Sequence, residues 1–450
     1  MTTTPHLVRT LGLRSLVLLG LAYMTPLIVL GIFGVIAEAT AGASASAYLL
    51  ALVAMLFTAA SYGRMASAYP VSGSAYTYVR RTIGARAGFM VGWAVLLDYL
   101  FLPMVIWLIG AAYLNAQFPS VSVAVWVLLF IAITTALNII GLRVADRANF
   151  VLMIAQFAVV IAFVVLSVAS VLRHDGGSGL FSAGPFANAG ASFSGVTAGA
   201  AIAAYSFLGF DAVTTFTEEA IDPRRTVPRA VLLVALLGGV IFIVVSYTTQ
   251  LVHPGGHFAD SSSAAHNIAA NIGGSLFGAV FLAGLVVAQF TSGLAAQASA
   301  SRLMYAMGRD GVLPRSVFGR VSRRFATPVA GILLSAVVGL LATFLNVATS
   351  TSFINFGAFV AFTCVNLSVI AHYLRNRGGA RMSPLHFLLL PALGAVVCVY
   401  LLFHLDSHAI LLGCAWAALG VCLLAYLTGG FTRQPPDVAI EEVEIVGAAG

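Results

Sequence analysis

Residues 20–34 read GLAYMTPLIVLGIFG, and they lie inside an apolar run that extends from Leu16 to about Ala37. This run is longer than the apolar core of a secretory signal peptide, which has about 7–15 residues. It therefore predicts a retained first membrane-spanning helix. Pro26 lacks a backbone N–H group, and Gly31 and Gly34 relax the steric limits on backbone angles. We expect this helix to be interrupted within the membrane.

The composition of the whole chain agrees with a membrane protein. Of the 450 residues, 60% are hydrophobic and only 8% are charged, and the mean hydropathy is +1.01. A soluble domain of this length could not hide so much apolar surface, whereas a lipid bilayer removes the need to hide it. The composition therefore excludes the soluble globular class.

Further apolar runs follow along the chain. A spanning helix needs roughly 20 mostly apolar residues. Twelve runs meet this requirement, at residues 16–38, 45–68, 86–114, 121–141, 149–172, 195–219, 229–252, 274–305, 328–346, 352–373, 385–404 and 408–429. The sequence therefore predicts an all-α integral membrane protein of about twelve transmembrane helices.

The basic residues indicate how these helices are oriented. All 22 are arginines, and with a cytoplasmic N-terminus 21 of them fall in inside segments and only Arg173 in an outside loop. Such an asymmetry is the positive-inside pattern of cytoplasmic membrane proteins. We therefore expect a multi-pass protein of the cytoplasmic (inner) membrane with both termini in the cytoplasm. Arginines placed in this way do not indicate a nucleic-acid partner.

A second interrupted helix is expected five spans after the first, where residues 206–211 read SFLGFD. Freed backbone groups at membrane depth are tolerated only where protein, water or a ligand satisfies them. Two broken helices at corresponding positions of two halves mark the substrate site of many transporters, and half-helix ends suit carboxylates and ammonium groups. The alternative is that these glycines only allow close helix packing.

Six stretches together carry a resemblance to a known family. They are GLAYMTP (20–26), SGSAYTY (72–78), GFMVGWAVLLDYLFLPM (88–104), SFLGFDAVTTFTEEAIDP (206–223), SRLMYAMGRDGVLP (301–314) and INFGAFVAFTCVNLSVI (354–370). With these motifs the chain resembles the amino acid–polyamine–organocation permeases from about residue 16 to 429, and within them the branch that includes bacterial putrescine importers.

The resemblance implies two inverted five-helix repeats, helices 1–5 and 6–10, with peripheral helices 11 and 12. We accordingly divide the chain into a cytoplasmic tail (1–14), a transport core (15–380), helices 11–12 (381–429) and an acidic cytoplasmic tail (430–450). The resemblance also implies alternating access, with the substrate between helices 1 and 6. The predicted substrate-binding residues are Tyr23, Thr25, Pro26, Leu30, Gly31, Ile32, Phe33, Gly34, Asp98, Tyr99, Ser206, Phe207, Leu208, Gly209, Phe210, Asp211 and Asn355.

Two positions depart from the pattern of the family. The putrescine importers that the chain resembles carry an aspartate where this chain has Gly31, and many amino acid permeases keep Gly-Ile-Phe there, as in residues 31–33. Several sodium-independent members carry a lysine where Gln156 falls. The substrate is therefore left open between a putrescine-like amine and an amino acid, and the coupling ion is open as well.

Several polar and aromatic residues are candidates for coupling, gating or binding. Asp98 lies near the middle of helix 3, where an ionised acid is costly unless it is paired or wet. We expect it to face a substrate ammonium group or to carry a proton, and packing alone is the alternative. Asp211 is expected either to cap the second half of helix 6 or to attract an amine. Phe207 and Phe210 could offer cation–π faces.

Glu218 and Glu219, close to Arg224 and Arg225, are expected to form an inner gate or a solvated surface pair. The hydroxyl groups of Thr291 and Ser292 in helix 8 could hold a cation, but more often such groups bond their own helix. Gln156 completes the coupling candidates.

The function predicted from the sequence is secondary active transport, namely proton-coupled import of an amine or amino acid. A membrane-embedded enzyme is a remote alternative, because clustered catalytic side chains are not found in the sequence. A chain without lysine has no Walker-type ATP motif. A channel would need repeated polar rings. We expect no cofactor and no bound metal; the expected partners are the substrate, the coupling proton and the lipid bilayer.

Overall fold

The computed structural model describes residues 10–70, 75–141, 146–309, 311–322, 324–325, 327–376 and 382–436. This part of the chain is helical, and its one extended pairing is an isolated bridge between Leu11 and Ala220. The spanning segments are α1, α2 and α3 (Leu13–Met24, Ile28–Gly31, Phe33–Ala39), α4 (Ser44–Ala68), α6 (Ala85–Gln117), α7 (Val123–Ile140), α8 (Asp146–His174), α10, η1 and η2 (Phe193–Ala203, Ala204–Phe207, Phe210–Glu218), α11 (Pro223–Val252), α12 (Ala264–Arg309), α13 and η4 (Val329–Gly339, Leu340–Thr343), α14 (Val347–Arg375), η5 and α15 (Leu385–Leu389, Leu390–Leu402) and α16 (Ser407–Leu427).

These segments confirm the predicted all-α membrane fold. Within the described residues, eleven helical segments are long and apolar enough to span a membrane, and Val329–Thr343 is a shorter apolar segment. Each of the twelve predicted runs corresponds to one of these segments. The predicted start of the eighth span at residue 274 coincides with a kink in α12, where Gly274 has a φ of +75°. The amphipathic helix α5 (Ala75–Thr82) was not predicted from the sequence.

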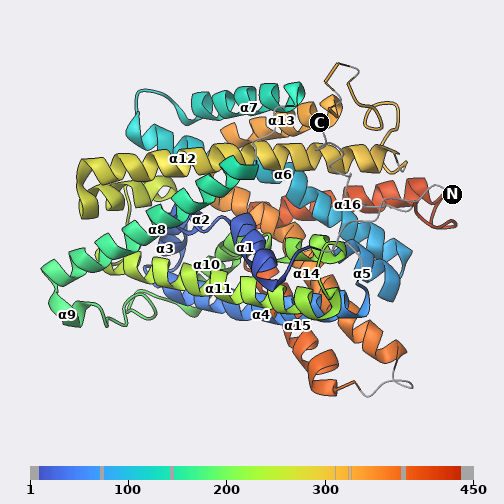
Figure 1. The fold of residues 1–450 in the computed structure, drawn as a ribbon, viewed down its shortest axis with the longest axis horizontal. Helices are drawn as coiled ribbons and strands as arrows, with labels where there is room; N and C mark the ends of the chain where they lie inside the picture. Colours follow the sequence, from blue (N-terminus) through green and yellow to red (C-terminus); the bar gives the residue numbers. More distant parts are fainter. Residues whose placement is uncertain are drawn as a thin grey trace.

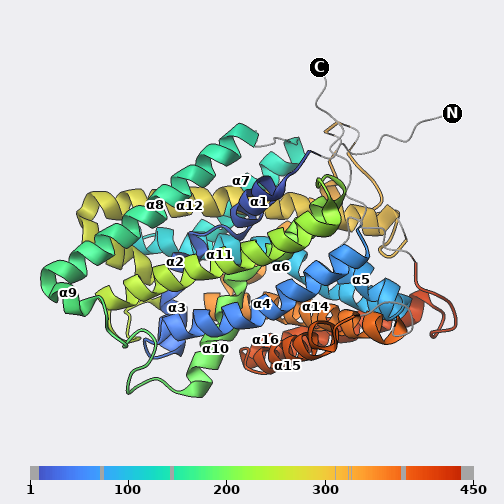
Figure 2. The ribbon, with the colours of Figure 1, turned by 60° about the horizontal axis from the view of Figure 1, so that its bottom comes forward.

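The helices divide into an inner and an outer set. In the apolar stretches of α6 and α14, 78% and 72% of the residues are buried inside the protein. In those of α8 and α16, only 17% of the residues are buried. Figures 1 and 2 show α4 beside α11, and α6 lies against α12. The helices α15 and α16 pack on α14 at one side of the bundle (Figure 2). The apolar surface of the outer set faces the bilayer, where lipid covers it.

A tryptophan pair joins the last helix to the inner set. The rings of Trp93 in α6 and Trp416 in α16 stack with centroids 4.6 Å apart. Each indole N–H donates to the backbone carbonyl of the other tryptophan, at 2.8 and 2.9 Å. Buried indole N–H groups need such partners. This reciprocal contact fixes α16 against the core of the bundle.

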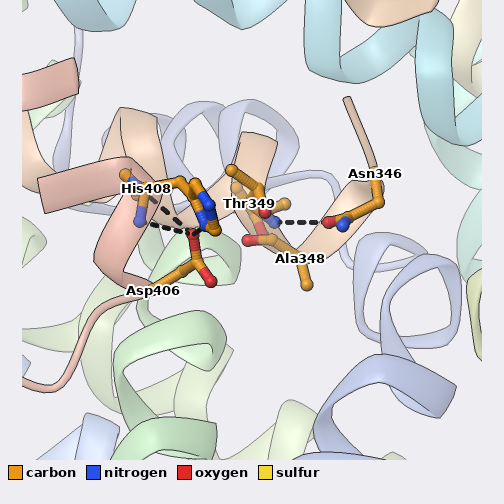
Figure 3. A network of polar contacts seen from close by, with 7 residues as sticks. Asn346, Ala348, Thr349, Asp406 and His408 are labelled. Atoms are coloured by element: carbon orange, nitrogen blue, oxygen red, sulfur yellow. Dashed lines mark hydrogen bonds and ion pairs between the residues drawn. The ribbon is translucent and has the colours of Figure 1, made fainter. Parts of the chain in front are cut away.

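Side chains cap two neighbouring helices at their N-terminal ends (Figure 3). The side chain of Asn346 accepts a hydrogen bond from the backbone N–H of Thr349 at 2.7 Å and so caps α14. Asp406 accepts from the N–H groups of His408 and Ala409 and begins α16. Such caps satisfy N–H groups that have no partner inside the helix.

Candidate functional site

The first spanning helix is interrupted as predicted. Helix α1 ends at Met24, and Thr25 takes a left-handed conformation with a φ of +47° immediately before Pro26. The chain then forms the short helix α2, breaks again at Ile32 and continues as α3. The backbone carbonyl of Leu30 accepts a hydrogen bond of 2.6 Å from the hydroxyl group of Tyr113 in α6. A side chain of the neighbouring helix thus satisfies a carbonyl of the broken segment.

The sixth spanning helix is interrupted as well. Helix α10 ends at Ala203 and is followed by a 3₁₀ turn through Phe207, after which Leu208 is extended and Gly209 has a φ of +102°. Only glycine adopts this angle without strain. The chain resumes as a second 3₁₀ segment from Phe210. The hydroxyl group of Ser206 lies 3.1 Å from that of Tyr48 in α4, within hydrogen-bond distance.

The two interruptions lie against each other. A Cβ atom added to Gly209 would lie 2.8 Å from Cδ1 of Tyr23, so the helix 6 break touches the end of α1. The segment η2 packs on α1. Because the two broken helices start five spans apart, they cross the membrane in opposite directions. Their adjacent breaks place irregular backbone from both halves at one location.

Two carboxyl groups face this location. One oxygen of Asp98 in α6, Oδ1, is buried and has no hydrogen-bond partner within the described part of the chain. Asp98 and Asp211 are close enough to interact electrostatically, and Tyr205 is close to Asp98 in the same way. The Oδ2 atom of Asp211 accepts a hydrogen bond of 3.2 Å from the hydroxyl group of Tyr62 in α4. Among the described residues, neither carboxyl group has a basic partner within 4 Å.

Helix α14 adds a further acceptor at a similar level. The side-chain amide of Asn355 donates to the carbonyl of Ala201 at 2.7 Å, near the end of α10. Its Oδ1 atom is buried and lacks a partner among the described residues. The ring contact between Phe353 and Phe101, at 4.7 Å, places this part of α14 beside the turn of α6 that carries Asp98. Buried acceptors without donors are costly, so these two oxygens suit a ligand that supplies N–H groups.

The aromatic candidates lie in the protein core. Phe207 and Phe210 are fully buried. The ring of Phe207 packs edge-on against Phe242 at 5.2 Å, and that of Phe210 packs against Tyr62 and Phe362 at 5.8 and 5.3 Å. Both rings therefore pack against other aromatic rings around the helix 6 break. A cation–π role for either ring stays a prediction.

The remaining binding candidates differ in exposure. Tyr23 is 52% exposed, and Leu30, Ile32 and Phe33 are fully buried. Thr25, Tyr99 and Leu208 are half-buried, whereas Pro26, Gly31 and Gly34 are buried. A Cβ atom on Gly31 would face Ile109 and Gln289 at ordinary contact distances, but one on Gly34 would collide with the carbonyl oxygen of Ser261.

Three of the coupling candidates lie on the neighbouring helices α8 and α12. Gln156 lines an apolar cavity of about 240 Å³ between α8 and α12. The hydroxyl group of Thr291 donates to the carbonyl groups of Val287 and Ala288 in its own helix, and Ser292 is half-buried. The cavity is also lined by Val287 and Ala288, and a role of Gln156 and Thr291 in coupling stays a prediction.

The expected inner gate has a different pattern of contacts. Arg225 lies 3.8 Å from Asp222 rather than beside Glu219, and both side chains are exposed. The backbone carbonyl of Glu219 accepts hydrogen bonds from the N–H groups of Thr10 and Leu11. The side chain of Glu218 lies outside the described residues, so a gate that includes it stays a prediction.

Three tyrosines around the breaks were not predicted from the sequence. Tyr48, Tyr62 and Tyr113 are fully buried, and their hydroxyl groups contact Ser206, Asp211 and Leu30. Buried tyrosines usually find a partner for the hydroxyl group. The available signal was a tyrosine within an otherwise apolar span, and it does not identify the partner.

Comparisons with known proteins agree with this architecture. The sequence pattern described as amino acid permease matches residues 15–426. The chain is 38% identical over 439 residues to the low-affinity putrescine importer PlaP of Escherichia coli (strain K12). This match covers 97% of this chain and 97% of that protein. It is 26% identical to the branched-chain amino acid permease BcaP of Lactococcus lactis, over 95% of this chain and 96% of that protein. It is 31% identical to the mouse cationic amino acid transporter 4, over 80% of this chain and 59% of that protein. With its broken first and sixth helices and this match over nearly its whole length, the chain belongs to the amino acid permease family of membrane transporters.

Proposed function

We propose that this transporter imports a small organic amine of the putrescine type across the cytoplasmic membrane by alternating access. One observation carries the proposal: Oδ1 of Asp98 and Oδ1 of Asn355 are buried acceptors without donors in the described part of the chain, beside two broken helices. A primary ammonium group has three N–H donors and a positive charge. It would satisfy both oxygens and offset the cost of a buried carboxylate.

A second carboxyl group favours a dication over a single ammonium ion. Asp211 lies close enough to Asp98 to interact with it electrostatically. Two carboxylates near each other in a site of low dielectric repel, and a basic partner for either is absent among the described residues. A diamine carries one positive charge at each end and would reduce this repulsion. The 38% identity to a putrescine importer supports the same class of substrate.

The test is uptake by the purified protein in proteoliposomes. Labelled putrescine is supplied with competing diamines, monoamines and a panel of amino acids, under an imposed pH gradient. Saturable putrescine uptake that other diamines suppress supports the proposal. If amino acids accumulate and putrescine does not, Gly31 marks an amino acid specificity and the amine assignment is wrong.

We further propose that protons drive the transport and that Asp98 is the group that carries them. The support is its buried, unpartnered oxygen in a membrane-spanning helix. Asp211, Tyr62 and Tyr205 are the other titratable groups close to it. Uptake by the wild-type protein should increase when the outside is made more acidic than the inside. An Asp98→Asn protein whose uptake responds to the gradient as the wild type does would contradict this assignment.

A further inference from the structure

A second cavity lies at the end of the bundle that the arginine distribution predicts to be outside. Its volume is about 600 Å³. Its walls come from three places: the residues that follow α3, the segment 175–188 that begins with the short helix α9 (Gly176–Gly179), and the end of α11 with the loop after it. It is separate in sequence from every residue that the proposed substrate site uses.

Hydrogen bonds between these segments hold the walls of the cavity in place. The hydroxyl group of Tyr247 in α11 donates to the carbonyl of Ser182 at 3.0 Å. The side-chain amide of Asn188 donates to the carbonyl of Ala41 at 3.1 Å. The backbone N–H of Ala45 donates to the carbonyl of Pro185 at 3.1 Å. The segment 175–188 is therefore fixed to both α4 and α11, and the cavity is preformed.

The polar groups that line the cavity favour a cation. The side-chain amide nitrogens of Asn188 and Gln250 both donate to backbone carbonyl groups of the surrounding loops, so these donors are already used. The charged side chain of the lining is Asp175. It is exposed, and within the described residues no basic group lies within 4 Å of its carboxylate. The nearby Arg173 donates its Nε–H to the carbonyl of Ala169 in its own helix.

The charge of the outer loops acts in the same direction. Under the predicted orientation this face carries the acids Glu38, Asp175, Asp260 and Asp406 and one arginine, Arg173. A cavity lined by one sign of charge raises the local concentration of ions of the opposite sign. We propose that this cavity is an outer binding site for organic ammonium ions, which holds the amine at Asp175 before it reaches the helix breaks. The inference rests on the proposed function, because the bound amine is the transported one.

The first experiment measures initial rates of labelled putrescine uptake by Asp175→Asn and wild-type proteoliposomes. An exposed ion pair contributes up to about 1 kcal/mol, which corresponds to about a two- to fivefold change in affinity. We therefore expect the KM to rise by this factor while the maximal rate stays the same. Asp406→Asn is the matched control: it removes an outer acid that does not line the cavity, asparagine still caps α16, and its KM should rise less than that of Asp175→Asn.

The second experiment measures binding without transport. Equilibrium binding of labelled putrescine is recorded for purified Asp98→Asn protein and for the Asp98→Asn/Asp175→Asn double variant. We expect the single variant to keep a weak binding component, whose affinity is about two- to fivefold lower in the double variant. If the double variant binds as the single variant does, the outer site is refuted, whatever the uptake rates. If wild-type proteoliposomes take up no putrescine, the proposed function fails, and the binding comparison still decides whether the cavity takes an amine.

Discussion

Replacing Asp98 with asparagine removes an ionisable carboxyl group from the helix breaks and changes little else. Asparagine has the same shape as aspartate and retains an acceptor oxygen in the position of the buried, unpartnered Oδ1. In the substrate-free protein, the change also removes the repulsion between Asp98 and Asp211. Affinity for an amine and stability without the amine should therefore change in opposite directions, which separates a binding role from a structural one.

The expected size follows from the contact that is lost. A hydrogen bond to a charged group contributes about 1.5–3 kcal/mol, and each 1.4 kcal/mol corresponds to about a tenfold change in affinity. Because asparagine can still accept a neutral hydrogen bond, we expect the KM for putrescine to rise by about ten- to one-hundredfold. Butylamine has a single ammonium group that Asp211 can still attract, so its competition should weaken less.

The assay combines uptake with thermal unfolding of the same preparations. Asp98→Asn should raise the KM for putrescine, and its melting temperature without substrate should equal or exceed that of the wild type. Asp98→Glu restores the charge and should recover part of the affinity. A KM within twofold of the wild type would refute the role of Asp98 in substrate binding. A high KM together with a large drop in melting temperature would mean that Asp98 serves packing instead.

Three further changes test the fold around the site. Gly34→Ala should lower stability by about 1–3 kcal/mol, because its Cβ would collide with the carbonyl of Ser261. Gly31→Ala should unfold within about a degree of the wild type, because a Cβ has room at this position. Equal melting temperatures of the two variants would contradict the packing. Gly209→Ala puts a side chain at a φ of +102°. It should lower stability by about 1–3 kcal/mol, as expected for a strained residue, and it should also reduce uptake. Unchanged uptake would mean that the break relaxes. Trp416→Phe loses one indole hydrogen bond and should cost about 1 kcal/mol of stability with an unchanged KM, and a shifted KM would assign the last helix a role in transport.

The breaks could be predicted from the sequence because their causes are local. Pro26 removes a backbone donor, and the structure places the left-handed residue Thr25 directly before it. Gly209 sits between two aromatic residues, and it has the positive φ that ends the first half of helix 6. Length and hydropathy likewise predict the spans, because the bilayer sets both requirements for each helix separately.

The partners of the site could not be predicted, because they depend on how helices pack. Tyr62 contacts Asp211 from 149 residues away, and Asn355 contacts helix 6 across 154 residues. The expected inner gate also depends on packing, although its residues are close in sequence. Proximity in sequence suggested a cluster of Glu218 and Glu219 with Arg224 and Arg225. In the structure Arg225 lies 3.8 Å from Asp222, and a gate that includes Glu218 stays a prediction. Helix α5 was missed because its arginines make it polar overall and its apolar face is short.

The position of Gly31 also limits whether Asp98 could replace the helix 1 aspartate that the resemblance to putrescine importers leads us to expect there. A side chain at Gly31 would point toward Ile109 in α6, and Asp98 lies eleven residues earlier in the same helix. At 1.5 Å per residue, the two levels are about 16 Å apart. Asp98 therefore cannot occupy the place of an acid at residue 31. If Asp98 and Asp211 bind the substrate, they hold it at the level of the helix 6 break, closer to the predicted cytoplasmic side than an acid in helix 1 would.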